Sequence, residues 1–245
     1  YQRRVRGTDN GNTWVKDTRK INNLAMFAMN VNGTVFVAQT GGTITRSRDN
    51  LKTLETINLG IPEIDLMRAM GSSQGAIFVG AGIRNKQQSI IMKSIDGGST
   101  FRTVFTGLGS NKDGYVSIQG FQDLGNGVIL ASAERKILRS QDNGDSWQQV
   151  FDITNLNSTI VIVRTFAVAK NGTVYVAYDS SFSSPENDMP EHNANSQIWF
   201  SEDHGLTWMF HSRLSTKRCF RLSFDDNEQN LFAGTGEKGE IWAYQ

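Results

Sequence analysis

Five copies of one short turn recur along this 245-residue chain and constrain its fold more than any other feature. Three copies agree closely and two are imperfect; in chain order they are 7–14 (GTDNGNTW), 47–54 (SRDNLKTL), 94–101 (SIDGGSTF), 140–147 (SQDNGDSW) and 201–208 (SEDHGLTW). We call these segments the repeat turns. Their aspartates are spaced 40, 47, 46 and 61 residues apart, and the 42 residues after the last aspartate plus the 9 up to the first would close a ring at 51. A period near 45 residues is typical of the blades of a β-propeller.

The shared pattern S-x-D-x-G-x-T-W resembles the Asp-box, or BNR repeat, of sialidases, sortilin-like receptors and many glycan-binding and phage proteins. The resemblance covers the whole chain as a repeat, so we expect a single propeller domain over residues 1–245. It implies an architecture and not a function, because unrelated activities share the repeat. It also implies that the repeat turns lie at the outer lower rim, away from the face that binds ligands.

The chemistry of the repeat turn favours a structural role for its aspartate. An aspartate carboxylate can accept hydrogen bonds from backbone N–H groups of its own loop. The glycine permits a backbone that other residues adopt only with strain, and the aromatic residue packs inward. We therefore expect Asp9, Asp96, Asp142 and Asp203 to stabilise turns, with Asp49 in a degenerate and weaker copy.

Short runs rich in β-branched and aromatic residues precede each repeat turn and read as strands. The expected second strands of the blades are 34–38, 76–80, 128–132, 173–177 and 230–234, and the first strands start near Asn23, Ile64, Val116, Ile162 and Cys219. Asn-Gly pairs at 32–33, 126–127 and 171–172 predict two-residue hairpin turns, because both positions tolerate φ > 0. The sequence predicts an all-β fold of five four-stranded antiparallel blades, in which the N-terminal segment Thr13–Asp17 is the outer strand of the C-terminal blade and closes the ring.

Composition excludes several classes of function. The net charge of +1 argues against a general electrostatic grip on nucleic acid or on an anionic membrane. No apolar run approaches 18 residues, so membrane insertion is not expected, and no N-terminal signal segment is visible.

The single cysteine, Cys219, cannot form an intrachain disulfide. His192, His204 and His211 lack paired metal-ligand spacing, and no cofactor is expected. Because the chain begins at Tyr1, we expect a processed product or an expressed fragment, which belongs to a larger parent chain or virion assembly.

Three irregular loops are expected on the ligand-binding face of such a propeller. They are the basic loop 81–88, the flexible loop 107–114 and the long insertion 179–196, which explains the 61-residue spacing. Long insertions in compact domains are usually functional or disordered. The candidate ligand-binding residues in or beside these loops are Arg84, Tyr115, Tyr178 and Phe182.

A second candidate site lies on the innermost strands, which line the central channel. Arg68, Gln119, Arg164 and Arg221 fall at nearly matching places in four first strands, with at most one residue of slippage. Convergent guanidinium groups bind carboxylates or phosphates, and the set resembles the arginine cluster with which sialidases hold a sialic acid. Alternatively, each arginine pairs with a nearby carboxylate such as Asp65 or Asp123, because buried charges must be paired.

No catalytic set is apparent in the sequence. Gly60 precedes Ile61-Pro62, so the Arg-Ile-Pro motif of sialidases is absent, and the channel carboxylates Asp65, Asp113 and Glu134 have no characteristic spacing. We therefore predict a non-catalytic module that binds a glycan or receptor on a cell surface, as propellers of phage tail fibres and adhesins do, at an extracellular or virion-surface location. The alternatives are a sialidase-like glycoside hydrolase and a scaffold propeller that binds protein.

Overall fold

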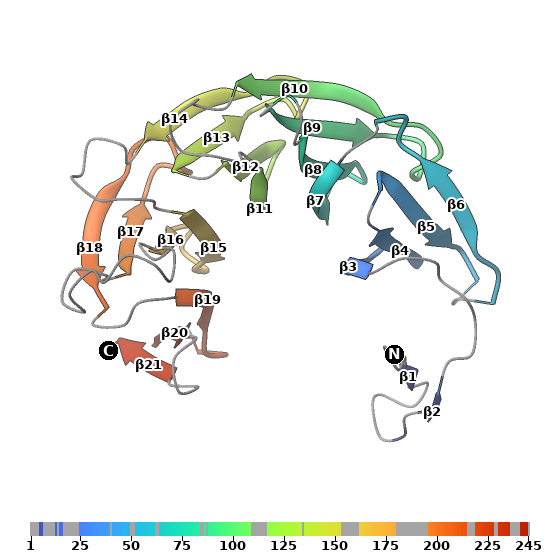
Figure 1. Cartoon of the computed structure of the whole chain (residues 1–245). Coiled ribbons are helices and arrows are strands. Elements are labelled where there is room, and N and C mark those ends of the chain that lie inside the picture. The colour runs from blue at the N-terminus through green and yellow to red at the C-terminus, as the bar shows by residue number, and fades with distance from the viewer. Residues whose placement is uncertain are drawn as a thin grey trace, which may run out of the picture.

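A computed structural model gives the fold of the chain (Figure 1). The structure describes residues 5–6, 13, 15–16, 25–39, 41–49, 52–61, 64–83, 86, 88–108, 117–133, 135–152, 162–179, 196–214, 219–227, 230–235 and 241–244. Within these residues the fold is all-β, as predicted, and consists of antiparallel sheets. No described segment forms a helix that is long and apolar enough to cross a membrane.

Four sheets have four strands each and follow one another along the chain. Blade 1 contains β3 (Ala25–Val31), β4 (Thr34–Gln39), β5 (Thr43–Ser47) and β6 (Glu55–Asn58). Blade 2 contains β7 (Ile64–Gly71), β8 (Ile77–Ile83), β9 (Gln88–Ser94) and β10 (Arg102–Leu108). Blade 3 contains β11 (Ile118–Gly125), β12 (Val128–Ala133), β13 (Lys136–Ser140) and β14 (Gln148–Asp152). Blade 4 contains β15 (Ile162–Val168), β16 (Val174–Asp179), β17 (Gln197–Ser201) and β18 (Met209–Arg213).

The chain ends in a fifth, three-stranded sheet, which we call the C-terminal blade. Its strands are β19 (Cys219–Phe224), β20 (Leu231–Thr235) and β21 (Ile241–Tyr244). A separate two-stranded sheet, the N-terminal hairpin, pairs β1 (Val5–Arg6) with β2 (Val15–Lys16). The predicted second strands and first-strand starts agree with the observed strands to within three residues.

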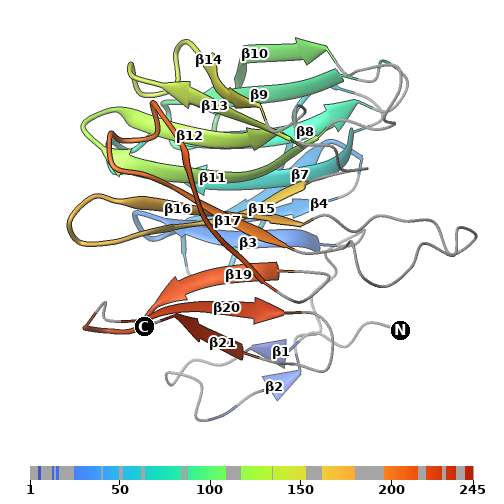
Figure 2. The ribbon, with the colours of Figure 1, turned by 90° about the vertical axis from the view of Figure 1, so that its left-hand side faces the viewer.

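The blades form an open arc with their first strands on its inner side (Figure 1). β3, β7, β11, β15 and β19 contact one another in that order. Buried apolar side chains fill the space between successive blades in four clusters. Seen side-on, the strands of every blade run across the thickness of the arc (Figure 2). The hydrophobic core is therefore a series of seams between neighbouring blades.

Two of the three predicted hairpin turns have the expected geometry. Asn32 and Gly33 have φ of 49° and 78°, and Asn126 and Gly127 have φ of 51° and 80°, as a type I′ turn requires. At the third pair only Gly172 has positive φ, at 88°. There the Asn171 side chain accepts a hydrogen bond from the Thr173 N–H at 3.0 Å, which builds a turn of another type.

The predicted ring closure is absent among the described residues. Val15–Lys16 pairs with β1 and not with β21, so the C-terminal blade lacks the fourth strand that the sequence predicted. The register explains why. In each complete blade the residue three before the repeat-turn aspartate faces the residue six after it, as Arg139 faces Gln148. Arg6 and Val15 stand in the same relation to Asp9. β1 and β2 are therefore the third and fourth strands of one blade.

Candidate functional site

The repeat turns have the structural role that the sequence predicted. In the turn 201–208, Asp203 Oδ1 accepts hydrogen bonds from the backbone N–H groups of Leu206 and Thr207 at 3.0 and 2.9 Å, and Oδ2 accepts one from the Thr207 hydroxyl. Asp49, Asp96 and Asp142 make corresponding bonds. The turn around Asp9 lies outside the described residues. These carboxylates accept hydrogen bonds within their own loops, so a binding site is expected at other residues.

Hydrogen bonding lowers the pKa of these aspartates. Hydrogen bonds from the Thr53 side chain and backbone lower the pKa of Asp49 to about 2. Desolvation would raise the pKa of Asp142 and of Asp203, but hydrogen bonds from Ser146 and from Thr207 outweigh it, and both pKa values lie at about 2. The Thr100 side chain and backbone likewise lower the pKa of Asp96. All four groups are carboxylates at neutral pH, so none can serve there as a proton donor.

Three buried cations on third strands connect one blade to the next, and sequence reasoning missed them. Arg46, Lys93 and Arg139 are 3%, 4% and 7% exposed. Arg46 donates to the carbonyl of Gly97 at 2.7 Å, and Arg139 to the carbonyl of His204 at 2.8 Å. Each acceptor is the residue after the aspartate in the repeat turn of the following blade.

Lys93 makes the equivalent contact by a different route. Its Nζ lies 2.7 Å from Oδ1 of Asp145, in the repeat turn of blade 3, and Arg102 also donates to this oxygen. Aligning the residue three before each repeat-turn aspartate would have found the pattern, since it reads Arg6, Arg46, Lys93, Arg139 and Phe200. These cations hold the arc together and are not available to a ligand.

The inner side of the arc brings together the basic residues that the sequence singled out. Arg68 on β7 and Arg221 on β19 face glycines at the same position of their second strands, Gly80 and Gly234. Gln119 and Arg164 are one place earlier, each at an irregularity in the pairing of its first strand. Four consecutive blades thus present Arg, Gln, Arg and Arg at one level of the first strands. We call these four residues the inner wall.

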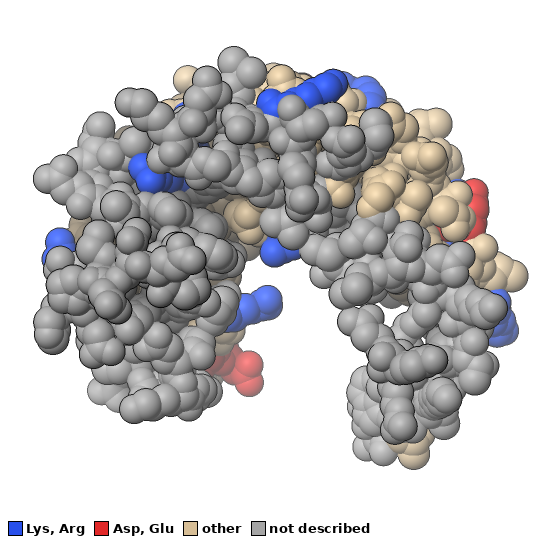
Figure 3. Space-filling view, viewed as in Figure 1, with Lys and Arg blue, Asp and Glu red and all other residues tan. Residues whose placement is uncertain are grey.

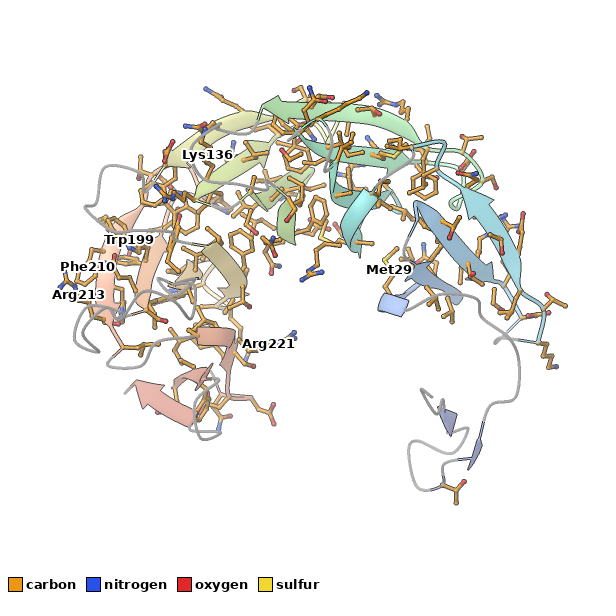
Figure 4. All side chains as sticks on the ribbon, viewed as in Figure 1. Met29, Lys136, Trp199, Phe210, Arg213 and Arg221 are labelled. Carbon is orange, nitrogen blue, oxygen red and sulfur yellow. The ribbon has the colours of Figure 1, made fainter. Side chains whose placement is uncertain are left out.

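The inner wall differs from the buried seam cations in its exposure. Arg221 is exposed and Arg68 is half-buried. Figure 4 shows the Arg221 side chain pointing into the central opening, and Figure 3 shows basic side chains at its margin. No carboxylate among the described residues forms an ion pair with Arg221. An exposed guanidinium in this position can take a carboxylate or phosphate from solution.

Other inner-wall contacts are local. The Gln119 side chain is half-buried and its Nε2 donates to the Ser117 hydroxyl at 2.5 Å. Asp123, which the sequence offered as a partner for an arginine, instead accepts backbone hydrogen bonds from Ser73 and Gly125 at 2.5 and 2.8 Å. For Asp65 and Arg164 the structure describes the backbone, in β7 and β15, and not the side chains.

Tyr178 is the one remaining ligand-binding candidate among the described residues, and it does not belong to the inner wall. Tyr178 is buried between blades 3 and 4, with its ring 6.0 Å from that of Phe151. Burial, with a smaller contribution from Asp152, raises the pKa of its hydroxyl well above 10. Arg84, Tyr115, Phe182, His192, Asp113 and Glu134 lie outside the described residues, as does most of the loops 107–114 and 179–196. Most of the predicted loop 81–88 is described, with 81–83 in β8 and Gln88 in β9. The described part of the chain holds no group of His, Cys, Asp or Glu suited to a metal ion.

Comparison with known proteins supports the propeller fold at low sequence identity. No protein-family model matches the chain, and no curated protein matches it. Among solved structures, the extracellular domain of the one component system BT4673 from B. thetaiotaomicron is similar with a TM-score of 0.68 at 11% identity, over 95% of this chain and 29% of that one. The GH74 xyloglucanase from Xanthomonas campestris has a TM-score of 0.66 at 12% identity, over 98% of this chain and 40% of that one.

A third similar structure is YCF48 bound to D1 peptide, with a TM-score of 0.58 at 18% identity, over 92% of this chain and 65% of that one. The present chain therefore spans less than two thirds of the length of each of these proteins. These similarities establish a β-propeller fold for the chain. At such identities they say nothing of its ligand.

Proposed function

We propose that this chain is a non-catalytic recognition propeller of the Asp-box class, and that its inner wall binds an acidic glycan or receptor on a cell surface. The single observation that carries the proposal is the exposed Arg221, which points into the central opening (Figure 4). Arg68 holds the equivalent register position in blade 2, which is separated from the C-terminal blade by blades 3 and 4. A guanidinium group exposed to this space favours a ligand that carries carboxylates.

The contrast between the two sets of cations supports this proposal. Arg46, Lys93 and Arg139 are buried and bound to carbonyl or carboxylate oxygens of the next blade. Arg221 is exposed and has no such acceptor among the described side chains. A charged side chain that stabilises nothing visible in the fold is a better candidate for binding than one that closes a seam.

The similar structures are compatible with this class of ligand. The xyloglucanase is named for action on a polysaccharide, and YCF48 is described as bound to a peptide.

The test compares acidic with neutral glycans and includes a matched arginine control. We expect binding of uronic-acid or sialic-acid glycans by isothermal titration calorimetry, weakened roughly tenfold or more by Arg221→Ala. Arg213→Ala should leave the affinity unchanged, because Arg213 lies over the Phe210 ring on the outer strand of blade 4, at the opposite edge of its sheet from the first strand β15. Equal loss in both variants, or no binding to any acidic glycan, would reject the proposal. Release of sugar that is lost on Arg164→Ala would favour the hydrolase instead.

A further inference from the structure

The outer edge of blade 4 carries exposed apolar side chains. Four large apolar side chains are exposed among the described residues, and three of them, Leu206, Met209 and Phe210, belong to the last repeat turn and β18. Their exposed fractions are 47%, 46% and 47%. We call these three residues the blade 4 patch. β18 is the outermost strand of its sheet (Figure 1), so the patch lies at the opposite edge from the first strand β15.

The preceding blades show that the fold does not need apolar side chains at these positions. Leu206, Met209 and Phe210 are the third, sixth and seventh residues after Asp203. The residues at the same three positions of blades 1 to 3 are all exposed and all polar or charged: Lys52, Glu55, Thr56, Ser99, Arg102, Thr103, Asp145, Gln148 and Gln149. Exposed apolar side chains that gather in one place mark an interaction site. The joint change at all three positions therefore indicates a contact that is specific to blade 4.

Neighbouring side chains hold the Phe210 ring in place. Trp199 faces Phe210 across the pair of strands β17 and β18, with the two rings 5.7 Å apart in an edge-to-face arrangement. The Trp199 indole N–H donates to Oε1 of Gln197 at 3.1 Å. The Arg213 guanidinium lies over the Phe210 ring, 5.9 Å from its centre. A side chain held in this way loses little conformational freedom when a partner covers it, which favours association.

Two exposed residues of opposite charge lie at the two ends of the patch. Arg213 is the last residue of β18 and pairs with Gln197 at the start of β17. Glu202 follows Ser201 at the other end of β17. Figure 4 shows Phe210 and Arg213 at the outer margin of the arc, on the side away from the central opening. Neither Glu202 nor Arg213 forms an ion pair with a described residue.

An edge that is acidic at one end, apolar in the middle and basic at the other end is complementary to itself. When two such edges meet antiparallel about a two-fold axis, the acid of each copy faces the base of the other, whereas parallel edges bring like charges together. We infer that the blade 4 patch is a contact between two copies of this chain, which associate through β18 into a two-fold symmetric pair.

The pairing of β17 with β18 locates the two-fold axis. Along β17, the midpoint between the levels of Arg213 and Glu202 falls between the levels of Met209 and Phe210. An axis through this point puts Met209 of one copy against Phe210 of the other, which is a favourable contact between sulfur and an aromatic ring. Leu206 then lies beside the aliphatic stem of Arg213 of the second copy. A contact of this size is small for a protein interface, so the pair separates on dilution.

Sedimentation equilibrium of the full 245-residue chain tests the association. The mass should rise from 27.2 kDa toward twice that value as the concentration increases to about 500 µM. Phe210→Ser should weaken the association about tenfold or more, because each pair loses two buried rings. The matched control is Ile95→Ser, which removes a side chain that is 76% exposed in the repeat turn of blade 2 and should leave the association unchanged. A chain that stays monomeric at every concentration, or equal weakening in the two variants, would overturn the inference.

Reversal of the two charges tests the two-fold arrangement independently of the apolar variant. Glu202→Arg alone should weaken the association about fivefold or more, because like charges then meet twice in each pair, and Arg213→Glu alone should do the same. An equimolar mixture of the two variants should associate as tightly as the parent chain, because each copy offers the charge that the other lacks. Circular dichroism checks that both variants are folded. The inference is wrong if the mixture stays as weak as its components, if either variant alone associates like the parent chain, or if assembly continues beyond two copies.

Discussion

A single aspartate holds each repeat turn because its carboxylate oxygens collect hydrogen bonds from one loop. Since these bonds lower the pKa of Asp203 from 3.8 to about 2, the carboxylate stabilises the fold above pH 4, and this contribution is lost as the pH falls through 2. Asp203→Asn should lower the free energy of unfolding by about 1 kcal/mol at pH 7, and the difference from the parent chain should shrink as the pH approaches 2.

The measurement is urea unfolding followed by fluorescence at several pH values. The matched control is Glu202→Gln, which removes the exposed carboxylate next in sequence and should change the free energy of unfolding little at any pH. A deficit in Asp203→Asn that stayed constant from pH 7 to pH 2 would contradict the role given to the carboxylate.

Glycine in the repeat turn has a packing role that its backbone conformation alone does not reveal. Gly144 has φ of 81°, and a Cβ placed on it would lie 2.2 Å from the Phe78 ring of the preceding blade. Gly144→Ala should therefore destabilise the chain by about 2 to 4 kcal/mol, from left-handed backbone strain and overpacking together.

Gly125→Ala separates the two effects. Gly125 has nearly the same φ, 82°, with no atom within 4 Å of the added Cβ, so only the strain of about 1 to 2 kcal/mol applies. Thermal unfolding by calorimetry should rank the parent chain above Gly125→Ala, and Gly125→Ala above Gly144→Ala. Equal loss in both variants would mean that contact with Phe78 adds nothing.

At the scale of strands, a cation crosses from one blade to the next in each of the three seams between blades 1 and 4. Arg139 on β13 donates to the carbonyl of His204 across 65 residues of sequence. Arg139→Met keeps most of the side-chain volume and leaves that carbonyl without its part-buried donor, so we expect a loss of about 1 to 3 kcal/mol. Arg213→Met, on the exposed edge strand β18, should cost less than about 0.5 kcal/mol. Chemical unfolding of both variants checks this prediction. An equal loss of stability would show that the hydrogen bond of Arg139 across the seam does not stabilise the fold.

The sequence predicted the strands and turns well because their determinants are local. Asn126-Gly127 forms its hairpin and Asp203 binds its own loop, each within a few residues. The seam cations escaped prediction because their partners belong to the next repeat. The predicted closure by Thr13–Asp17 is wrong because this segment pairs with β1, which is a third strand of the same blade. Arg6 aligns with Arg46 and is the signal that could have identified it.

The inner wall was predicted only in part, and bulges are the reason. Arg68 and Arg221 share a register position, which spacing to the next hairpin approximated. Gln119 and Arg164 are displaced by an irregularity of the pairing that a single sequence does not reveal. The burial of Tyr178 was not predicted either, because it depends on a residue of another blade. The Tyr178 ring packs against Phe151 of blade 3.

The molecule as a whole behaves as a linear array, because every core cluster lies between two successive blades. Blade 3 is packed on both sides, by the clusters that contain Ile129 and Leu130, whereas the described side chains pack the C-terminal blade against blade 4 alone. In an array of this kind stability is a sum over neighbouring units, and the end units open first. The proposed ligand binding at Arg221 would therefore depend on a blade that the described side chains support at one seam.

Hydrogen exchange followed by mass spectrometry tests this arrangement directly. Amides of β12 should exchange slowest and those of β20 markedly faster, because β12 is buried between two seams. Leu222→Ala, in the C-terminal blade, should speed exchange in β19–β21 alone. Leu130→Ala should cost about 2 to 5 kcal/mol and speed exchange throughout the chain. A closed ring would support both faces of the C-terminal blade, so equally slow exchange in β20 and β12 would contradict the open arc. Acidic glycan that binds at Arg221 should slow exchange in β19 first, since the open end gains most from an added contact.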